Sequence, residues 1–248
     1  MTYQNDAALA ERLARTAGEL LTTLRASKLF EDRAAGEAGD AIAHQFLVRA
    51  LAEARPEDAV LSEEGAADPA RLACRRVWIV DPLDGTREYS EGRSDWAVHV
   101  ALAVDGEPVA GAVALPGLGL VLSSHATDAL CAPAARLRML VSRTRPGADS
   151  VAVAERIGAD LVAMGSAGAK AMAVVRGEAE IYLHSGGQYE WDSCAPVAVA
   201  RAHGLHVSRA DGSALIYNRE NPWMPDLLIC RPEWAEAVLR ETCRAPAA

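Results

Sequence analysis

Carboxylates that follow two short apolar segments are the side chains best suited to chemistry in this chain of 248 residues. The apolar residues 77–80 lead directly to Asp81, and Asp84 follows three positions later in the run Asp-Pro-Leu-Asp-Gly-Thr. A second apolar segment, residues 59–62, leads to Glu63. Carboxylates that meet at strand ends repel one another in a low dielectric, so such a cluster is stable only around a cation. Hard oxygen ligands of this kind select Mg²⁺ or Mn²⁺, and the sequence therefore predicts a divalent-metal site.

The residues around Asp84 are also suited to binding a phosphate. We expect Pro82 to end the strand and to turn the chain so that both carboxylates face one point. Asp84 is then placed at the N-cap of a helix, and the N–H groups of Gly85 and Thr86 can bind a phosphate beside the metal. The chemistry that this predicts is metal-assisted hydrolysis of a phosphate ester. The alternative is that Asp84 and Gly85 form only a turn and that the acids are a solvated edge.

Four separated motifs resemble a known family, the lithium-sensitive, magnesium-dependent phosphomonoesterases related to inositol monophosphatase and fructose-1,6-bisphosphatase. They are the DPxDGT element at residues 81–86, the upstream Glu63 and Glu64, the Gly-Ser-Ala-Gly-Ala-Lys run at 165–170, and the element at 190–196 that resembles WDxxAP. The resemblance covers essentially the whole chain in order. It implies a layered α-β-α-β-α sandwich.

The resemblance also implies a metal centre and a mechanism. Two or three Mg²⁺ ions would be held by Glu63, Asp81, Asp84, Asp192 and the backbone carbonyl of Leu83. Mn²⁺ would be able to replace Mg²⁺, and Li⁺ would inhibit the enzyme. One ion would lower the pKa of an attacking water and another would stabilise the leaving oxygen. Glu63, Thr86 and Asp84 are the expected catalytic groups, and no covalent enzyme intermediate is required.

One segment departs from the family pattern. Many members carry a lysine and then a Thr-x-Ala-Asp segment upstream, whereas this chain has Glu37 in place of the threonine. Asp40 can stand in for the acid and is the expected ligand of a third metal, through water.

The substrate is suggested by finer likenesses. Residues 87–89 (Arg-Glu-Tyr) and 186–190 resemble the 3′(2′),5′-bisphosphate nucleotidase branch, including actinobacterial members active in sulfate assimilation. We therefore expect removal of the 3′-phosphate of adenosine 3′,5′-bisphosphate, and of its 5′-phosphosulfate analogue, giving AMP and phosphate from the former. The predicted substrate contacts are Gly85, Thr86, Arg87, Ser166, Gly168, Lys170 and Asp192.

Several of these side chains have simpler interpretations. Lys170, one of only two lysines in the chain, is a candidate for the 5′-phosphate but could be a solvated helix residue. Arg87 could touch phosphate or pair with a surface acid. We expect His99 to be a buried core histidine rather than a ligand, His184 to border the pocket, and Tyr189 either to stack on adenine or to pack.

Three other functions compete with this one. A generalist phosphatase acting on inositol monophosphate or fructose-1,6-bisphosphate is the main alternative, because these ligands present similar phosphates. An enzyme that forms an aspartyl-phosphate is disfavoured, since its two acids lie two residues apart and Asp81 and Asp84 lie three apart. A non-catalytic metal-binding relative is disfavoured because none of the acids needed for two metals is missing.

The elements that must position these residues divide the chain into two halves of an α/β protein. Residues 1–130 are predicted to be α+β, a helix pair with an antiparallel sheet that carries most of the metal ligands. The expected helices and strands are 6–26, 37–54, 59–62, 77–80, 96–104, 109–115 and 120–123, with a type I′ turn at Asp105-Gly106.

Residues 131–248 are predicted to be an α/β half that completes the active site with Asp192. Strands are expected at 138–142, 160–164, 180–183, 205–208 and 227–230. Helices are expected at 149–157, 166–175, 193–203 and 232–243.

Composition limits the partners and the location. The formal net charge of −9 disfavours binding to nucleic-acid polymers or to anionic membrane surfaces. The longest apolar stretch, residues 109–122, is too short and too interrupted by glycine and proline to span a bilayer. We see no secretory signal, and the five scattered cysteines without a CxxC pair indicate reduced thiols and a cytoplasmic protein. The family resemblance also favours a homodimer.

Overall fold

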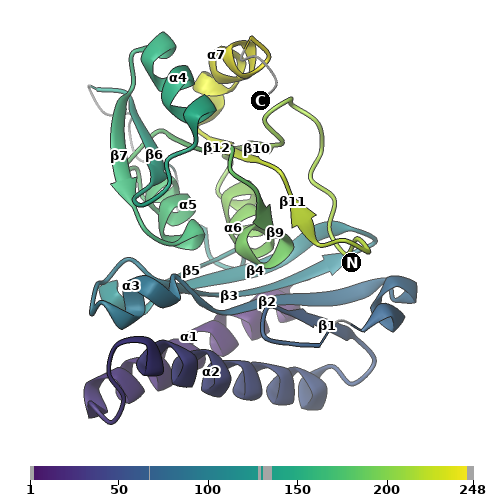
Figure 1. The fold of residues 1–248 in the computed structure, drawn as a ribbon. Coiled ribbons are helices and arrows are strands. Elements are labelled where there is room, and N and C mark those ends of the chain that lie inside the picture. The colour runs from purple at the N-terminus through teal and green to yellow at the C-terminus, as the bar shows by residue number, and fades with distance from the viewer. Residues whose placement is uncertain (1–2, 67, 128–129, 131–135, 245–248) are drawn as a thin grey trace.

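Five layers of helix and sheet make up the computed structural model, which describes residues 3–66, 68–127, 130 and 136–244 (Figure 1). Helices α1 (Gln4–Ser27) and α2 (Asp32–Ala54) cover one face of a first sheet. Helices α5 (Ala167–Val175) and α6 (Glu190–Ala202) lie between this sheet and a second one. Helices α4 (Ala148–Ile157) and α7 (Pro232–Thr242) cover the outer face of the second sheet. This arrangement confirms the predicted α-β-α-β-α sandwich.

The first sheet has the strand order β1-β2-β3-β4-β5. The strands are β1 (Ala59–Ser62), β2 (Arg76–Asp84), β3 (Ala97–Val104), β4 (Glu107–Leu115) and β5 (Leu120–Ser123). Strand β1 is parallel to β2, and the other pairs are antiparallel. Asp105 and Gly106 both have positive φ, 50° and 83°, which confirms the predicted turn between β3 and β4. Short helices η1 (Pro69–Ala73), α3 (Thr86–Ser90) and η2 (Pro116–Leu118) connect the strands.

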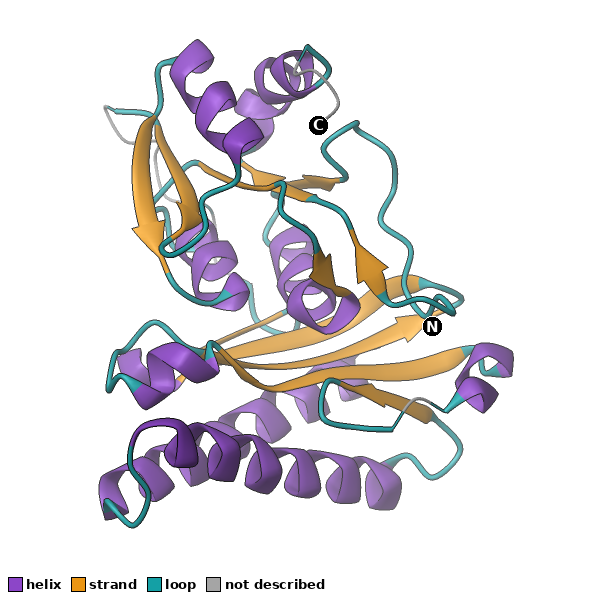
Figure 2. Ribbon diagram, in the orientation of Figure 1, coloured by secondary structure: helices purple, strands orange, loops and turns teal. Residues whose placement is uncertain are grey.

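The second sheet has the order β10-β12-β8-β6-β7. The strands are β6 (Arg138–Ser142), β7 (Asp160–Met164), β8 (Ile181–His184), β10 (His206–Ser208) and β12 (Leu227–Cys230). Strand β6 is parallel to β7 and β8, whereas β12 is antiparallel to both of its neighbours. A separate ribbon pairs β9 (Gln188–Tyr189) with β11 (Trp223–Met224). The sequence did not predict this ribbon, because two-residue strands show no periodic pattern. Figure 2 shows the ribbon beside α6.

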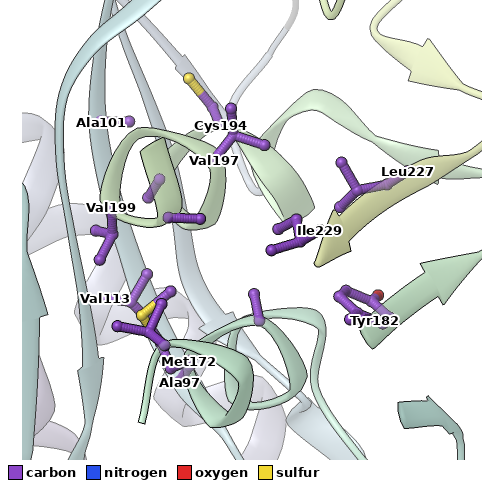
Figure 3. Packing of buried hydrophobic residues seen from close by; sticks show 14 of the residues in the cluster. Ala97, Ala101, Val113, Met172, Tyr182, Cys194, Val197, Val199, Leu227 and Ile229 are labelled. Carbon is purple, nitrogen blue, oxygen red and sulfur yellow. The ribbon is translucent and has the colours of Figure 1, made fainter. Parts of the chain in front are cut away.

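Apolar periodicity accounts for the packing of these layers. Leu9, Leu13, Ala17 and Leu21 recur every four residues and form the buried face of α1, which packs on β3 and β4. On the opposite face of the sheet, side chains such as Val113, Met172 and Val197 interdigitate between β4, α5 and α6 (Figure 3).

A glycine sets how closely α6 approaches the first sheet. A Cβ atom on Gly111 of β4 would lie 2.8 Å from the Cβ of Ala198 and 3.2 Å from the carbonyl oxygen of Ala195, both in α6. The helix therefore rests almost directly on the strand. This contact fixes the position of the first turn of α6, which carries Asp192.

Three local predictions are wrong in detail. Pro82 does not end β2; the strand runs to Asp84, with a shift of register between Asp81 and Asp84. Asp84 is not the N-cap of the following helix, because Gly85 takes that place with φ 87°. Helix α2 starts at Asp32 and α6 at Glu190, earlier than predicted, since their first turns contain few large apolar residues.

The proposed division at residue 130 lies next to residues 128–129 and 131–135, which are outside the described residues. It stays a prediction. No helix among the described residues is both long and apolar enough to cross a membrane.

Candidate active site

Three aspartates from distant parts of the chain meet at one point. Asp81 and Asp84 lie at the end of β2, and Asp192 lies in the first turn of α6. Each offers a carboxylate oxygen, and these oxygens all lie within 4.8 Å of one another. The irregular end of β2 makes this possible, because the shifted register lets both of its carboxylates approach α6. The structure thus brings together three of the predicted metal ligands.

Two further acids border this group of three aspartates. Glu63 follows β1, and its N–H donates to the carbonyl of Val80 in the neighbouring β2 at 3.4 Å. Burial and the charge of Asp192 raise the pKa of Glu63 to about 7. Burial and the charge of Glu64 raise the pKa of Asp40 to about 7 as well. Glu63 therefore lies within electrostatic reach of the aspartates, and Asp40 lies within electrostatic reach of Glu63.

The electrostatics of this site fit a divalent cation. Burial and the charge of Asp84 raise the pKa of Asp192 to about 6. Burial and the charge of Glu63 raise the pKa of Asp81 well above its usual range. Burial and the repulsion among these carboxyls outweigh the nearby His99 and Lys170, which act to lower the pKa of Asp192. A cluster of hard oxygen ligands with this excess of negative charge is suited to Mg²⁺ or Mn²⁺.

Asp84 differs from the other acids because it is surrounded by hydrogen-bond donors. Its Oδ2 accepts bonds from Ser166 Oγ at 2.5 Å and from the N–H of Gly168 at 2.6 Å, and its Oδ1 accepts from the N–H of Ala167 at 3.1 Å. His99 Nε2 lies 3.1 Å from Oδ2. Burial alone would raise the pKa of Asp84, but the charge and hydrogen bonds of these neighbours hold it well below its usual range. Asp84 is therefore a fixed carboxylate.

Ser166 and Gly168, which were predicted to contact the substrate, are hydrogen-bonded to Asp84 instead. The hydroxyl of Ser166, which is the N-cap of α5, and the N–H of Gly168 both bind Asp84 rather than facing open space. A Cβ atom on Gly168 would lie only 2.0 Å from His99 Nε2, so this glycine admits the histidine rather than a ligand. Contact of these two residues with a nucleotide stays a prediction that the geometry does not favour.

Thr86 and Leu83 lie side by side at the same point. Thr86 Oγ1 donates to the carbonyl of Leu83 at 3.1 Å and lies 3.5 Å from Asp40 Oδ1. The N–H of Leu83 in turn donates to Asp81 Oδ1 at 3.0 Å. The left-handed conformation of Gly85 turns the chain so that Thr86 can reach back to this carbonyl. The predicted catalytic threonine therefore contacts two of the predicted ligands.

A cavity of about 640 Å³ opens from Asp84 and Asp192. Lys170 lines it and is 5% exposed; its Nζ donates to the carbonyls of Ser166 at 2.5 Å and Gly165 at 3.3 Å. The interpretation of Lys170 as a solvated helix residue is therefore wrong. Burial lowers the pKa of this lysine.

Other predicted residues lie around the same cavity. Arg87 lines it but pairs with Glu91 at 2.8 Å, as the simpler interpretation held. His184 borders the cavity as predicted, with Nε2 2.8 Å from the carbonyl of Gly187. Tyr189 is 45% exposed and stacks on Trp191, with the ring centres 4.8 Å apart.

Sequence reasoning missed several cavity residues, among them Arg143, Arg145 and Trp223. Arg143 pairs with Glu88 of α3 at 2.7 Å and so joins β6 to α3 at the cavity wall. The two arginines stand just after a correctly predicted strand, 138–142, and that position was the available signal. Trp223 lies in β11, a two-residue strand with no periodic pattern to predict it.

Comparisons with known proteins agree with this geometry. A model of the inositol monophosphatase family matches residues 3–139 and 121–247. A 3′-phosphoadenosine 5′-phosphate phosphatase of Mycobacterium leprae is 48% identical over 251 residues, covering 94% of this chain and 92% of the relative. The 3′(2′),5′-bisphosphate nucleotidase CysQ of Escherichia coli K12 is 30% identical over 195 residues, covering 73% and 78%. Both are matched over most of their length.

Solved structures show the same fold. CysQ from Bacteroides thetaiotaomicron aligns with a TM-score of 0.80 at 24% identity, covering 92% of this chain and 98% of that one. Inositol monophosphatase II from Staphylococcus aureus aligns with a TM-score of 0.81 at 19% identity, covering 96% and 92%. At these identities the likeness concerns the fold.

Proposed function

This chain belongs to the inositol monophosphatase family, and from that premise we propose that it is a phosphatase which removes the 3′-phosphate of adenosine 3′,5′-bisphosphate. The products are AMP and inorganic phosphate. The relatives that are about half identical to it over nine-tenths of its length carry the name of this activity. The expected enzyme class, a bisphosphate nucleotidase, agrees with them.

The observation that carries the proposal is the mixed charge of the cavity lining. The acids Asp84 and Asp192 line the cavity together with the cationic groups of Lys170, Arg143 and Arg145. A bisphosphate can place its scissile phosphate at the two aspartates, where divalent cations neutralise it, and its second phosphate at these cationic groups. Tyr189 and Trp223 supply exposed aromatic surface at the same cavity for a base.

We propose that Glu63, Asp81, Asp84, Asp192, Asp40 and the carbonyl of Leu83 hold the divalent cations. When bound, Mg²⁺ supplies Lewis-acid stabilisation of the phosphoryl oxygens and a lower pKa for the attacking water. Glu63, which lies within electrostatic reach of Asp81, Asp84 and Asp192, would take up the proton of that water. Thr86, oriented by its bond to the Leu83 carbonyl, assists this proton transfer. Asp84 stays ionised throughout.

Several finer points belong to the same proposal. We propose that two or three Mg²⁺ ions bind, that Mn²⁺ substitutes, and that Li⁺ inhibits. We also propose that the enzyme works in the cytoplasm, in sulfate assimilation, as a homodimer whose chain divides near residue 130. The family membership and the cluster of carboxylates support the metal part of this proposal.

The test is a steady-state comparison of phosphate release from adenosine 3′,5′-bisphosphate, inositol 1-phosphate and fructose-1,6-bisphosphate, with Mg²⁺ and with EDTA. We expect kcat/KM to be highest for the bisphosphonucleotide and activity to vanish in EDTA. Equal kcat/KM values for all three substrates would instead favour the generalist phosphatase. Full activity in EDTA would contradict the metal-dependent mechanism.

A further inference from the structure

His99 is the third residue of β3 and lies next to the aspartate group. Its side chain is fully buried, and its cross-strand neighbour in β2 is Asp81. Nδ1 lies 2.9 Å from the carbonyl oxygen of Trp191, and Nε2 lies 3.1 Å from Oδ2 of Asp84. The ring therefore joins the carboxylate of Asp84 to the peptide that immediately precedes Asp192.

Both neighbours of this ring are oxygen acceptors. The contact of Nδ1 with the Trp191 carbonyl has hydrogen-bond geometry, whereas Nε2 lies against Asp84 Oδ2 at 3.1 Å without it. The ring thus contacts one oxygen on each side, one from β2 and one from α6.

The surroundings hold the ring in place. The N-terminus of α5 closes over Nε2, where a Cβ atom on Gly168 would lie 2.0 Å away. The same Cβ would lie 3.1 Å from the Cβ of Ala97 in β3, so strand and helix are in close contact around the ring. Because the ring is packed this tightly between β3 and α5, a shift of the ring would shift both elements.

We propose that His99 is a positioning residue that fixes Asp84 and the first turn of α6 relative to each other, and so sets the separation of Asp84 and Asp192 for divalent-cation binding. This inference rests on the proposed function, because it assumes that these aspartates hold cations. His99 itself contacts neither cation nor substrate. Loss of a residue that orients a metal ligand typically weakens metal affinity by about 10- to 100-fold.

The experiment compares His99→Gln with a matched control, His206→Gln. His206 is a partly buried histidine of β10 whose ring contacts Ser208, on the second sheet. The dissociation constant for Mg²⁺ is measured by titration calorimetry on EDTA-stripped protein, and Tm is measured without metal. We expect His99→Gln to weaken Mg²⁺ binding by about 10-fold or more and His206→Gln to leave it unchanged. A purely structural role would lower Tm of the metal-free protein without changing the Mg²⁺ affinity of the folded fraction, and that result would overturn the proposal.

One further measurement applies if His99→Gln does not fold. In Gly168→Ala the added methyl group displaces the ring, and we expect the same loss of Mg²⁺ affinity; unchanged affinity would overturn the proposal. If the wild-type protein itself fails to bind Mg²⁺, the metal part of the proposed function fails with it, whereas equal binding by wild type and variants contradicts only this inference.

Discussion

The buried carboxylate of Glu190 accepts a hydrogen bond of 2.6 Å from the backbone N–H of Asn218, and a second of 2.9 Å from the N–H of Arg219. Glu190 is the first residue of α6, two positions before Asp192. Arg71 of η1 clamps the same loop, donating to Asn218 Oδ1 at 2.6 Å and to the carbonyl of Arg219 at 2.8 Å. The loop therefore ties the start of α6 to the first sheet.

Glu190→Ala should destabilise the protein. The change leaves two backbone N–H groups without their acceptor in a buried site, which costs about 1–3 kcal/mol for each unsatisfied group. The free energy of unfolding, measured in urea, should fall by about 2–6 kcal/mol. Glu236→Ala is the matched control, because Glu236 is 88% exposed and pairs only with Arg240 on the same helix. A Glu190→Ala variant as stable as this control would contradict the assignment.

Asp192→Asn should remove activity and leave the fold intact. Asp192 Oδ2 accepts the N–H of Tyr189 at 2.6 Å, and the amide oxygen of asparagine can keep that bond. The charge at the proposed metal site is lost, so kcat/KM should fall by about 10³-fold or more, corresponding to roughly 4 kcal/mol. Circular dichroism should match the wild type, and Tm of the metal-free protein should not fall, because the change removes a buried negative charge that Asp84 repels. Activity within tenfold of the wild type would show that Asp192 is not needed.

Asp84→Asn should both inactivate and destabilise the protein. The NH₂ group of asparagine would face donors already present, the Ser166 hydroxyl and the N–H groups of Ala167 and Gly168. We therefore expect Tm of the metal-free protein to fall for Asp84→Asn and not to fall for Asp192→Asn. Equal Tm values for the two variants would contradict the hydrogen bonding described for Asp84.

Lys170→Met should weaken binding of a bisphosphate more than that of a monophosphate. If the ammonium group attracts the second phosphate, its loss raises KM for adenosine 3′,5′-bisphosphate by about tenfold and changes KM for 3′-AMP much less. The matched control is Lys28→Met, at the exposed end of α1, which should change neither value. Equal changes in KM for both substrates would remove Lys170 from the second-phosphate site.

The effect of Mg²⁺ on stability should grow with pH. The pKa values of Asp40 and Glu63 are raised to about 7 and that of Asp192 to about 6, above the values near 4 of an unfolded chain. In the metal-free protein these groups favour folding at pH below about 4, and this contribution is lost as pH rises through 6–7. Mg²⁺ competes with the same protons, so saturating Mg²⁺ should raise Tm by at least ~3 °C more at pH 8 than at pH 5.5. A larger effect at pH 5.5 would contradict the assignment.

The sequence predicted the elements where large apolar residues recur with a clear period. Helix α1 is an example, with Leu9, Leu13 and Leu21 on its buried face. Its observed ends lie within two residues of the predicted ones, and the same holds for strands β1, β3, β6 and β7. The first residues of α2 were missed because Ala35 and Gly36 pack closely with little or no side-chain volume, and such positions do not contribute to a hydrophobic period.

The site was predictable to the same extent. The acids were identified because their types and order are distinctive, and the structure places Asp192 beside Asp81 and Asp84. The residues that contact those acids were not identified from the sequence. His99, Ser166 and Gly168 meet Asp84 only because tertiary packing brings them together. A buried histidine in a strand looks the same in sequence whether it fills the core or holds a carboxylate.

The most direct test of the account is the position of a divalent cation in the crystal. Crystals grown with Mn²⁺ should give anomalous scattering peaks about 2.1 Å from carboxylate oxygens of Asp81, Asp84 and Asp192, a distance typical of small hard cations. The contrary result is manganese bound only at other sites, with the three carboxylates contacting protein groups alone. That result would contradict the central claim that the carboxylates form a metal centre.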